Sequence, residues 1–156
     1  MPEREYIQAN LTEIEKFKES LAVFRFNAPE MRPFRAGQFN WISLQTPDRT
    51  DPIERPYSIL SAPYQNPKLE YFIRLVSSGG EGKTEKETGK RMGLMTGELF
   101  NTSEEDLQNP DKYRFMVSPI GLGKLFPKEG DNRRIIAFGT GTGMTPFIGM
   151  KEKEQK

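Results

Sequence analysis

The sequence predicts a mainly β protein that changes to an α/β pattern between residues 130 and 150. Two observations predict this class. Short segments of alternating apolar and polar residues fill most of 6–76, and a strand-like segment at 134–138 runs into a glycine-rich turn. The alternating segments indicate an antiparallel barrel or sandwich. The turn, Gly139-Thr140-Gly141-Thr142-Gly143, is typical of a phosphate site at the start of a helix.

Strands are expected at 6–17, 21–26, 39–44, 69–76 and 113–117. The segment 69–76 is the clearest, because aromatic and β-branched residues dominate it. Residues 83–95 have a helix-forming composition that Gly89 and Gly93 weaken, and the acidic stretch 102–111 is expected to be a surface loop. Thr145 is expected to cap a helix that has Pro146 at its first position.

The change of pattern predicts a domain boundary. Residues 1–131 are expected to form the β domain, and 132–156 the first strand, turn and helix start of a doubly wound nucleotide-binding domain. The missing remainder of such a domain would need about 100 further residues.

Composition excludes several kinds of chemistry. The chain of 156 residues has no cysteine and no histidine, so disulfides, thiolate catalysis and the commonest metal ligands are absent and no metal site is predicted. Any redox chemistry would have to come from a bound cofactor. A net charge of +1 gives no reason to expect nucleic acid or an anionic membrane as a partner. The N-terminus lacks the apolar core of a signal peptide and no apolar run could span a bilayer, which predicts a cytoplasmic protein.

The segment Arg55-Pro56-Tyr57-Ser58 combines three useful groups. A guanidinium can bind a phosphate through a bidentate fork, a tyrosine ring can stack on a flat heterocycle, and a hydroxyl can bond a ring nitrogen. Alternation sends Arg55 and Tyr57 to one face and Ser58 to the other, unless a bulge or a strand end lets all three converge. A strand with one surface arginine and one half-buried tyrosine would have the same sequence. Similarly, an ordinary strand-to-helix connection could explain the glycine-rich turn.

Four segments in order resemble the ferredoxin–NADP reductase family, most of all the bacterial flavodoxin/ferredoxin–NADP reductases. They are 34–39 (FRAGQF), 55–58 (RPYS), 118–121 (SPIG) and 139–147 (GTGTGMTPF). The resemblance implies a six-stranded antiparallel Greek-key β-barrel that binds FAD, followed by the first βα unit of a nucleotide-binding domain.

The resemblance also implies roles for individual residues. It places Arg55 at the FAD pyrophosphate, Pro56 beside it, Tyr57 against the isoalloxazine and Ser58 near flavin N5, with Tyr57 and Ser58 in the catalytic positions. Phe72 would be an aromatic residue beside the cofactor.

Further cofactor-binding positions follow from two other parts of the sequence. Gly97-Glu98 resembles the family's Gly-Asp turn, and counting back from it places Thr88 where a Ser or Thr opens a pyrophosphate-binding helix. The NADP diphosphate would rest on Gly139, Thr140 and Gly141, and Thr142 would approach the flavin.

The implied activity is electron transfer between NADPH and ferredoxin or flavodoxin through FAD. Two alternatives stay open. One is another flavin reductase of the same superfamily, which would supply an oxygenase or use FMN. The other is an FAD-binding module without activity of its own, either a truncated gene product or a subunit that takes its nucleotide domain from a second chain.

Overall fold

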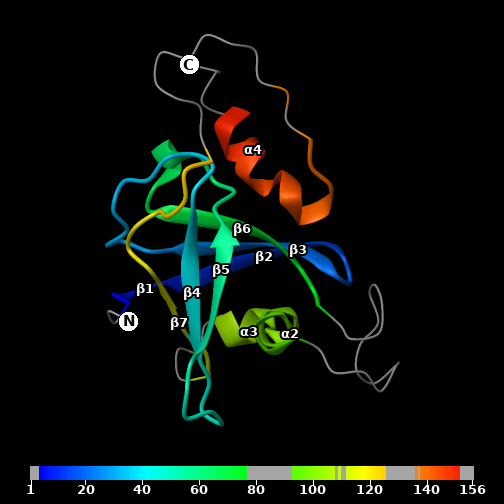
Figure 1. The fold of residues 1–156 in the computed structure, drawn as a ribbon. Coiled ribbons are helices and arrows are strands. Elements are labelled where there is room, and N and C mark those ends of the chain that lie inside the picture. Colours follow the sequence, from blue (N-terminus) through cyan, green and yellow to red (C-terminus); the bar gives the residue numbers. More distant parts are fainter. Residues whose placement is uncertain are drawn as a thin grey trace.

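The computed structural model describes residues 4–76, 93–107, 109, 112–125, 136 and 138–151, and in this part of the chain the strands form two antiparallel sheets (Figure 1). The four-stranded sheet has the order β1-β7-β4-β5, and the three-stranded sheet the order β2-β3-β6. The strands are β1 Ile7–Gln8, β2 Asn10–Lys18, β3 Leu21–Asn27, β4 Phe39–Gln45, β5 Ile53–Ser58, β6 Lys68–Arg74 and β7 Arg114–Val117. The mainly β, antiparallel architecture predicted from the alternation is confirmed.

Alternating side chains of both sheets build the core. On β6, Leu69, Tyr71 and Ile73 are buried, and their neighbours Glu70 and Phe72 face the other side. The same period of two buries alternate residues of β3 and β4: Ala22, Phe24, Phe26, Asn40, Ile42 and Leu44. Each large apolar side chain that leaves water contributes about 1.5–3 kcal/mol, so this shared interior holds the two sheets together.

The two sheets are connected by backbone hydrogen bonds at two places. The amide of Ala9, between β1 and β2, donates to the Phe115 carbonyl oxygen at 3.1 Å. The Leu60 amide, two residues after β5, donates to the Glu70 carbonyl oxygen at 2.8 Å. Elsewhere the described strands remain in separate ladders, so the closed barrel that we expected is not present among them as one continuous sheet.

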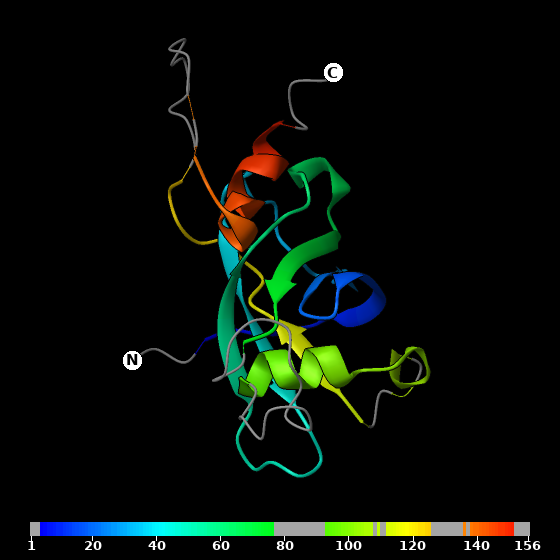
Figure 2. The ribbon, with the colours of Figure 1, turned by 90° about the vertical axis from the view of Figure 1, so that its right-hand side faces the viewer.

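Helices lie at opposite ends of the sheets (Figures 1 and 2). At one end are α2 (Leu94–Asn101) and α3 (Glu104–Leu107). At the other end are η2 (Gly141–Met144) and α4 (Thr145–Lys151), and a short 3-10 turn, η1 (Pro63–Gln65), follows β5. Within the described ranges, no helix is long and apolar enough to cross a membrane.

Helix α2 corrects two expectations. The predicted helix at 83–95 lies almost wholly outside the described residues, and α2 begins at Leu94 and includes Gly97 and Glu98. The expected Gly-Asp-like turn is therefore wrong. Burial of Met95, Leu99 and Phe100 outweighs the low helix propensity of glycine. The surface loop expected at 102–111 also contains a helical turn, α3.

The strand expected at 134–138 is not found at the positions that the structure describes. Residues 134, 135 and 137 lie outside the described part, as does the predicted domain boundary between 131 and 132. Ile136 and Phe138 are described, belong to no strand and are 72% and 89% exposed. A strand needs a neighbour to pair its backbone, and the described residues provide none beside this segment.

Candidate functional site

The RPYS segment forms β5, which is the edge strand of the four-stranded sheet. In the β4–β5 register, Arg55 lies opposite Ile42, and Tyr57 lies opposite Asn40. Because Ile42 and Asn40 are core-facing, Arg55 and Tyr57 lie on the core side of β5, at the edge facing the other sheet. Ser58 has the opposite parity and is the last residue of the strand. The alternation expected for the three side chains is confirmed.

The Arg55 side chain is exposed although its strand position faces the core. Its Nη1 donates to the carbonyl oxygen of Glu54 at 2.7 Å. Among the described residues, no carboxylate lies within ion-pair distance of this guanidinium. Most of its donors are thus available to an external anion, and a phosphate matches their fork geometry.

Tyr57 is half-buried and packs against a second tyrosine. Its ring and the ring of Tyr71 meet edge-on, with centroids 6.4 Å apart and an interplanar angle of 64°. Burial raises the pKa of Tyr57 to about 12, against the smaller, opposing influence of the Arg55 charge. At neutral pH the residue is therefore a neutral phenol with part of its ring open to solvent.

Ser58 and Pro56 complete the strand segment. The Ser58 hydroxyl is half-buried and has no hydrogen-bond partner in the described part of the chain. The Ser58 backbone pairs with Phe39, and two residues later the chain leaves this ladder to bond β6 through Leu60. Pro56 is exposed and lies opposite Trp41.

Phe72 lies on the face of β6 opposite the core. Its ring meets the ring of Phe17 edge-on at 5.9 Å. Val23 lies opposite Phe72 on β3 and is buried outside the main core cluster. The structure thus brings Tyr71 rather than Phe72 to Tyr57. Our sequence reasoning missed Tyr71, although the alternation along β6 could have indicated it.

The glycine-rich turn lies at the same end of the molecule as the end of β5. Gly141 has φ +54°, and an added Cβ there or at Gly143 would meet no atom within 4 Å. The helix that follows packs closely on the segment after Ser58, because a Cβ on Gly149 would lie 2.9 Å from the Leu60 carbonyl oxygen. The helix after the glycine-rich turn therefore packs on the segment that follows RPYS, at one end of the sheets (Figure 2).

The expected cap of this helix is wrong by one position. Thr145 is already helical and is the first residue of α4, so Pro146 occupies the second position. The Thr145 hydroxyl donates back to the Thr142 carbonyl oxygen at 2.7 Å instead of accepting a helix N–H. The preceding 3-10 turn, in which Thr140 is the extended residue before Gly141, provides the entry to the helix. Gly139 packs against the Met144 sulfur, where a Cβ would lie 2.8 Å away.

One expected site residue and one cavity remain to be placed. Thr88 lies outside the described residues, and the turn from which it was counted is a helix.

A cavity of about 100 Å³ lies between the start of β2, α3 and β7, and its lining includes none of the predicted site residues. In the described ranges, no group of three acidic side chains is arranged to hold a metal ion.

Several solved structures share this architecture, and two of them contain bound FAD. A ferredoxin–NADP+ reductase from Neisseria gonorrhoeae with bound FAD and NADP has a TM-score of 0.74 at 22% identity, with 98% of this chain and 53% of that chain covered. A flavohemoglobin from Malassezia yamatoensis with bound FAD and heme has a TM-score of 0.68 at 19% identity, with 95% and 34% covered.

A third similar structure serves an oxygenase. The ferredoxin reductase in carbazole 1,9a-dioxygenase has a TM-score of 0.65 at 17% identity, with 94% of this chain and 38% of that chain covered. No protein-family model matches the chain, and no curated protein matches its sequence. The chain spans about half the length of the first of these three solved proteins and less than half the length of the other two. It has the fold of the FAD-binding module of the ferredoxin–NADP+ reductases, which confirms the resemblance at the level of fold.

Proposed function

We propose that this chain is the FAD-binding module of a flavin-dependent oxidoreductase that transfers electrons between NADPH and ferredoxin or flavodoxin. One observation carries the proposal. In a fold shared with FAD-containing reductases, an exposed guanidinium that has no carboxylate partner among the described residues lies on the same strand face as a partly exposed tyrosine ring. A cation beside a flat aromatic face matches the phosphates and the ring system of a flavin dinucleotide.

The residues present fit FAD, and each has a distinct role. Arg55 binds the pyrophosphate, and the exposed part of Tyr57 orients the planar ring. Ser58 presents toward flavin N5 a hydroxyl that has no partner in the described part of the chain, since the chain turns away from the β5 ladder just after it. Bound FAD would convert a two-electron hydride into single electrons, and the protein would position the ring and exclude water.

The proposal includes the finer architecture of the family. The hydrogen bonds at Ala9 and Leu60, each linking the two sheets, support one Greek-key barrel of six strands in which β1 and β2 count as one bent strand. The boundary near residue 131 and the glycine-rich turn would begin the nucleotide domain, with NADPH bound at Gly139–Thr142. The rest of that domain would come from the same polypeptide or from a second chain.

A second function is favoured by a specific similarity. The reductase of carbazole 1,9a-dioxygenase and phthalate dioxygenase reductase share this fold with TM-scores of 0.65 and 0.62. The chain could equally belong to an oxygenase-type electron-transfer component. The mass of the flavin extracted from purified protein separates FAD from FMN, and reduction assays with ferredoxin, flavodoxin and oxygenase acceptors separate the two functions.

The first test of the proposal is flavin binding by the purified chain. We expect a yellow protein, or a colourless one that takes up FAD and then shows a resolved flavin spectrum. A protein that ignores added FAD would contradict the proposal.

The role of Ser58 is tested in an enzyme completed with a nucleotide domain. Ser58→Ala should slow hydride transfer in single-turnover reduction while FAD stays bound. Ser43→Ala is the matched control, because Ser43 is a fully buried serine on β4 whose hydroxyl has no partner among the described residues. Unchanged reduction kinetics in Ser58→Ala would remove this role.

A further inference from the structure

A buried hydrogen-bonded pair, Asn40 and Tyr71, lies directly beside Tyr57. The Tyr71 hydroxyl donates to Asn40 Oδ1 at 2.8 Å, and neither residue is exposed. Asn40 Nδ2 donates in turn to the carbonyl oxygen of Ser118 at 3.3 Å. A buried amide is costly unless its polar atoms are bonded, so these two bonds hold Asn40 and the far end of Tyr71 in one arrangement.

Both members of the pair contact the proposed stacking residue. Asn40 is the direct cross-strand neighbour of Tyr57 in the β4–β5 register. The Tyr71 ring is the aromatic ring that Tyr57 meets edge-on among the described residues. The pair therefore links β4 and β6 behind the half-buried side of Tyr57 and leaves its exposed side free.

The other end of this chain of contacts is anchored on the sheet. The Ser118 amide donates to the Trp41 carbonyl oxygen at 2.9 Å, and the Trp41 amide donates to Ser118 Oγ at 3.1 Å. Because Ser118 is bound on both sides, its carbonyl oxygen is a fixed acceptor for Asn40. A shift of Tyr71 would break a buried bond rather than exchange it with water.

We propose that Asn40 and Tyr71 are positioning residues that set the orientation of the Tyr57 ring for stacking on the planar ring of a flavin. The inference rests on the proposed function, because it assigns a ligand to the exposed side of Tyr57. Neither residue touches the flavin. Both act through Tyr57, so their effect on flavin binding depends on the presence of that ring.

The test is a double-mutant cycle read by FAD affinity and by the visible circular dichroism of bound flavin. Tyr71→Phe removes one hydroxyl and keeps the ring. We expect it to weaken FAD binding about three- to tenfold, because without the hydroxyl bond the Tyr71 ring can shift and weaken its edge-on contact with Tyr57. It should also change the dichroism of bound flavin. In a Tyr57→Leu background the same substitution should change neither quantity.

A second variant separates positioning from stability. Tyr71→Phe alone leaves the Asn40 oxygen unsatisfied, so it lowers Tm. Tyr71→Phe/Asn40→Leu removes the unsatisfied oxygen but also the donor to the Ser118 carbonyl oxygen, so it should recover only part of that Tm, yet flavin affinity and dichroism should stay altered. The control is Phe100→Leu, a core change on α2 at the Phe24–Phe100 contact, which should lower Tm with wild-type flavin dichroism.

The outcomes distinguish the inference from the proposed function. An equal effect of Tyr71→Phe with and without Tyr57, or flavin signals that recover together with Tm, would overturn the positioning role. If the wild-type chain bound no FAD, the proposed function would fail. NMR of labelled tyrosine in the flavin-free protein would then still decide whether Tyr71→Phe releases the Tyr57 ring, and unchanged Tyr57 signals would contradict the inference.

Discussion

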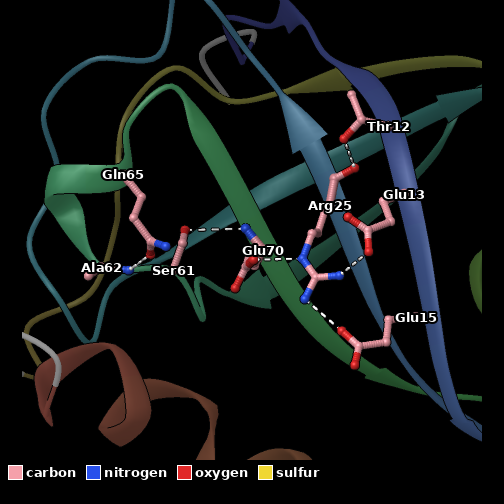
Figure 3. Close-up of polar contacts among 8 residues, drawn as sticks. All are labelled: Thr12, Glu13, Glu15, Arg25, Ser61, Ala62, Gln65 and Glu70. Atoms are coloured by element: carbon pink, nitrogen blue, oxygen red, sulfur yellow. Dashed lines mark hydrogen bonds and ion pairs between the residues drawn. The ribbon is translucent and has the colours of Figure 1, made fainter.

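Two arginines on neighbouring sheets have opposite surroundings. Arg25, on the outer face of β3, bonds Glu13, Glu15 and Glu70 at 2.6–2.7 Å (Figure 3). Arg55, on β5, has one bond to a backbone carbonyl and no carboxylate partner in the described part of the chain. The bonds to Glu70 and Glu15 raise the pKa of Arg25 above its usual value. Strand register decides the difference, since Glu13 and Glu70 lie directly opposite Arg25 on either side.

The comparison suggests that the two arginines have different roles. A guanidinium whose three nitrogens each bond a carboxylate of a neighbouring strand stabilises the sheet and is less available to a ligand. A guanidinium left without a carboxylate contributes little to folding but can bind a phosphate. The predictions below test whether Arg25 is structural and Arg55 is functional.

The largest effect is expected for Arg55→Ala. Loss of a charge-assisted hydrogen-bond fork should weaken FAD binding about 10- to 100-fold. The free energy of unfolding of the flavin-free chain should change by less than about 0.5 kcal/mol, because the side chain makes no ion pair with any residue that the structure describes. Arg55→Lys keeps the charge but loses the fork and should be intermediate. Isothermal titration with FAD measures the series, and an affinity equal to wild type in Arg55→Ala would contradict the assignment.

Arg25→Met should have the reverse pattern. It leaves three carboxylates close together with no cation among them, which should lower the free energy of unfolding by about 1–2 kcal/mol. FAD affinity should remain within about twofold of wild type, a change of less than about 0.5 kcal/mol. Urea denaturation and FAD titration on the same preparation check both. A stable variant that has lost FAD binding would reverse the comparison.

Single carboxylates of the Arg25 cluster should matter unequally. The Glu70 side chain is 24% exposed and that of Glu15 is 45% exposed, so the Glu70 bond is less screened by water. We expect Glu70→Gln to cost up to about 1 kcal/mol and Glu15→Gln less than about 0.5 kcal/mol. Denaturation at low salt and at high salt measures the difference, which should shrink as salt is added. If Glu70→Gln and Glu15→Gln lowered the free energy of unfolding by the same amount at both salt concentrations, the cluster would not be electrostatic.

The smallest effect concerns the pH dependence of stability near Arg55. The pKa of Tyr57 is raised from 10.0 to about 12, so the stability gained by burying the neutral phenol is present below pH 10 and is lost as pH rises toward 12. Tyr57→Phe should remove this part of the alkaline loss. Arg55→Gln should raise the pKa of Tyr57 further, since the positive charge favours the phenolate. An NMR titration of labelled tyrosine measures both. A lower pKa of Tyr57 in Arg55→Gln would contradict the electrostatic influence of Arg55 on Tyr57.

Much of the fold could be predicted from residue patterns. The expected strands at 21–26, 39–44 and 69–76 coincide with β3, β4 and β6 to within two residues at each end, because period-two burial is a local property. The Arg25 cluster could not be predicted in this way. Its partners come from two other strands, β2 and β6, and alternation predicts which face a residue takes but not which residue lies opposite it.

The candidate site was predictable only in part. The side-chain parity of Arg55, Tyr57 and Ser58 follows from alternation, and the structure confirms it. The buried position of Asn40 follows from the same rule, but its bond to Tyr71 depends on how two sheets face each other. Thr88 was counted from a glycine-containing turn that is helical, because tertiary burial of α2 overrides local propensity.

The most direct test of the central claim compares FAD with riboflavin, which has the same ring but no phosphate. Wild type and Arg25→Met should bind FAD much more tightly than riboflavin, and Arg55→Ala should lose most of that preference. This result would locate phosphate recognition at Arg55. A preference that persists in Arg55→Ala, or disappears in Arg25→Met, would contradict the account.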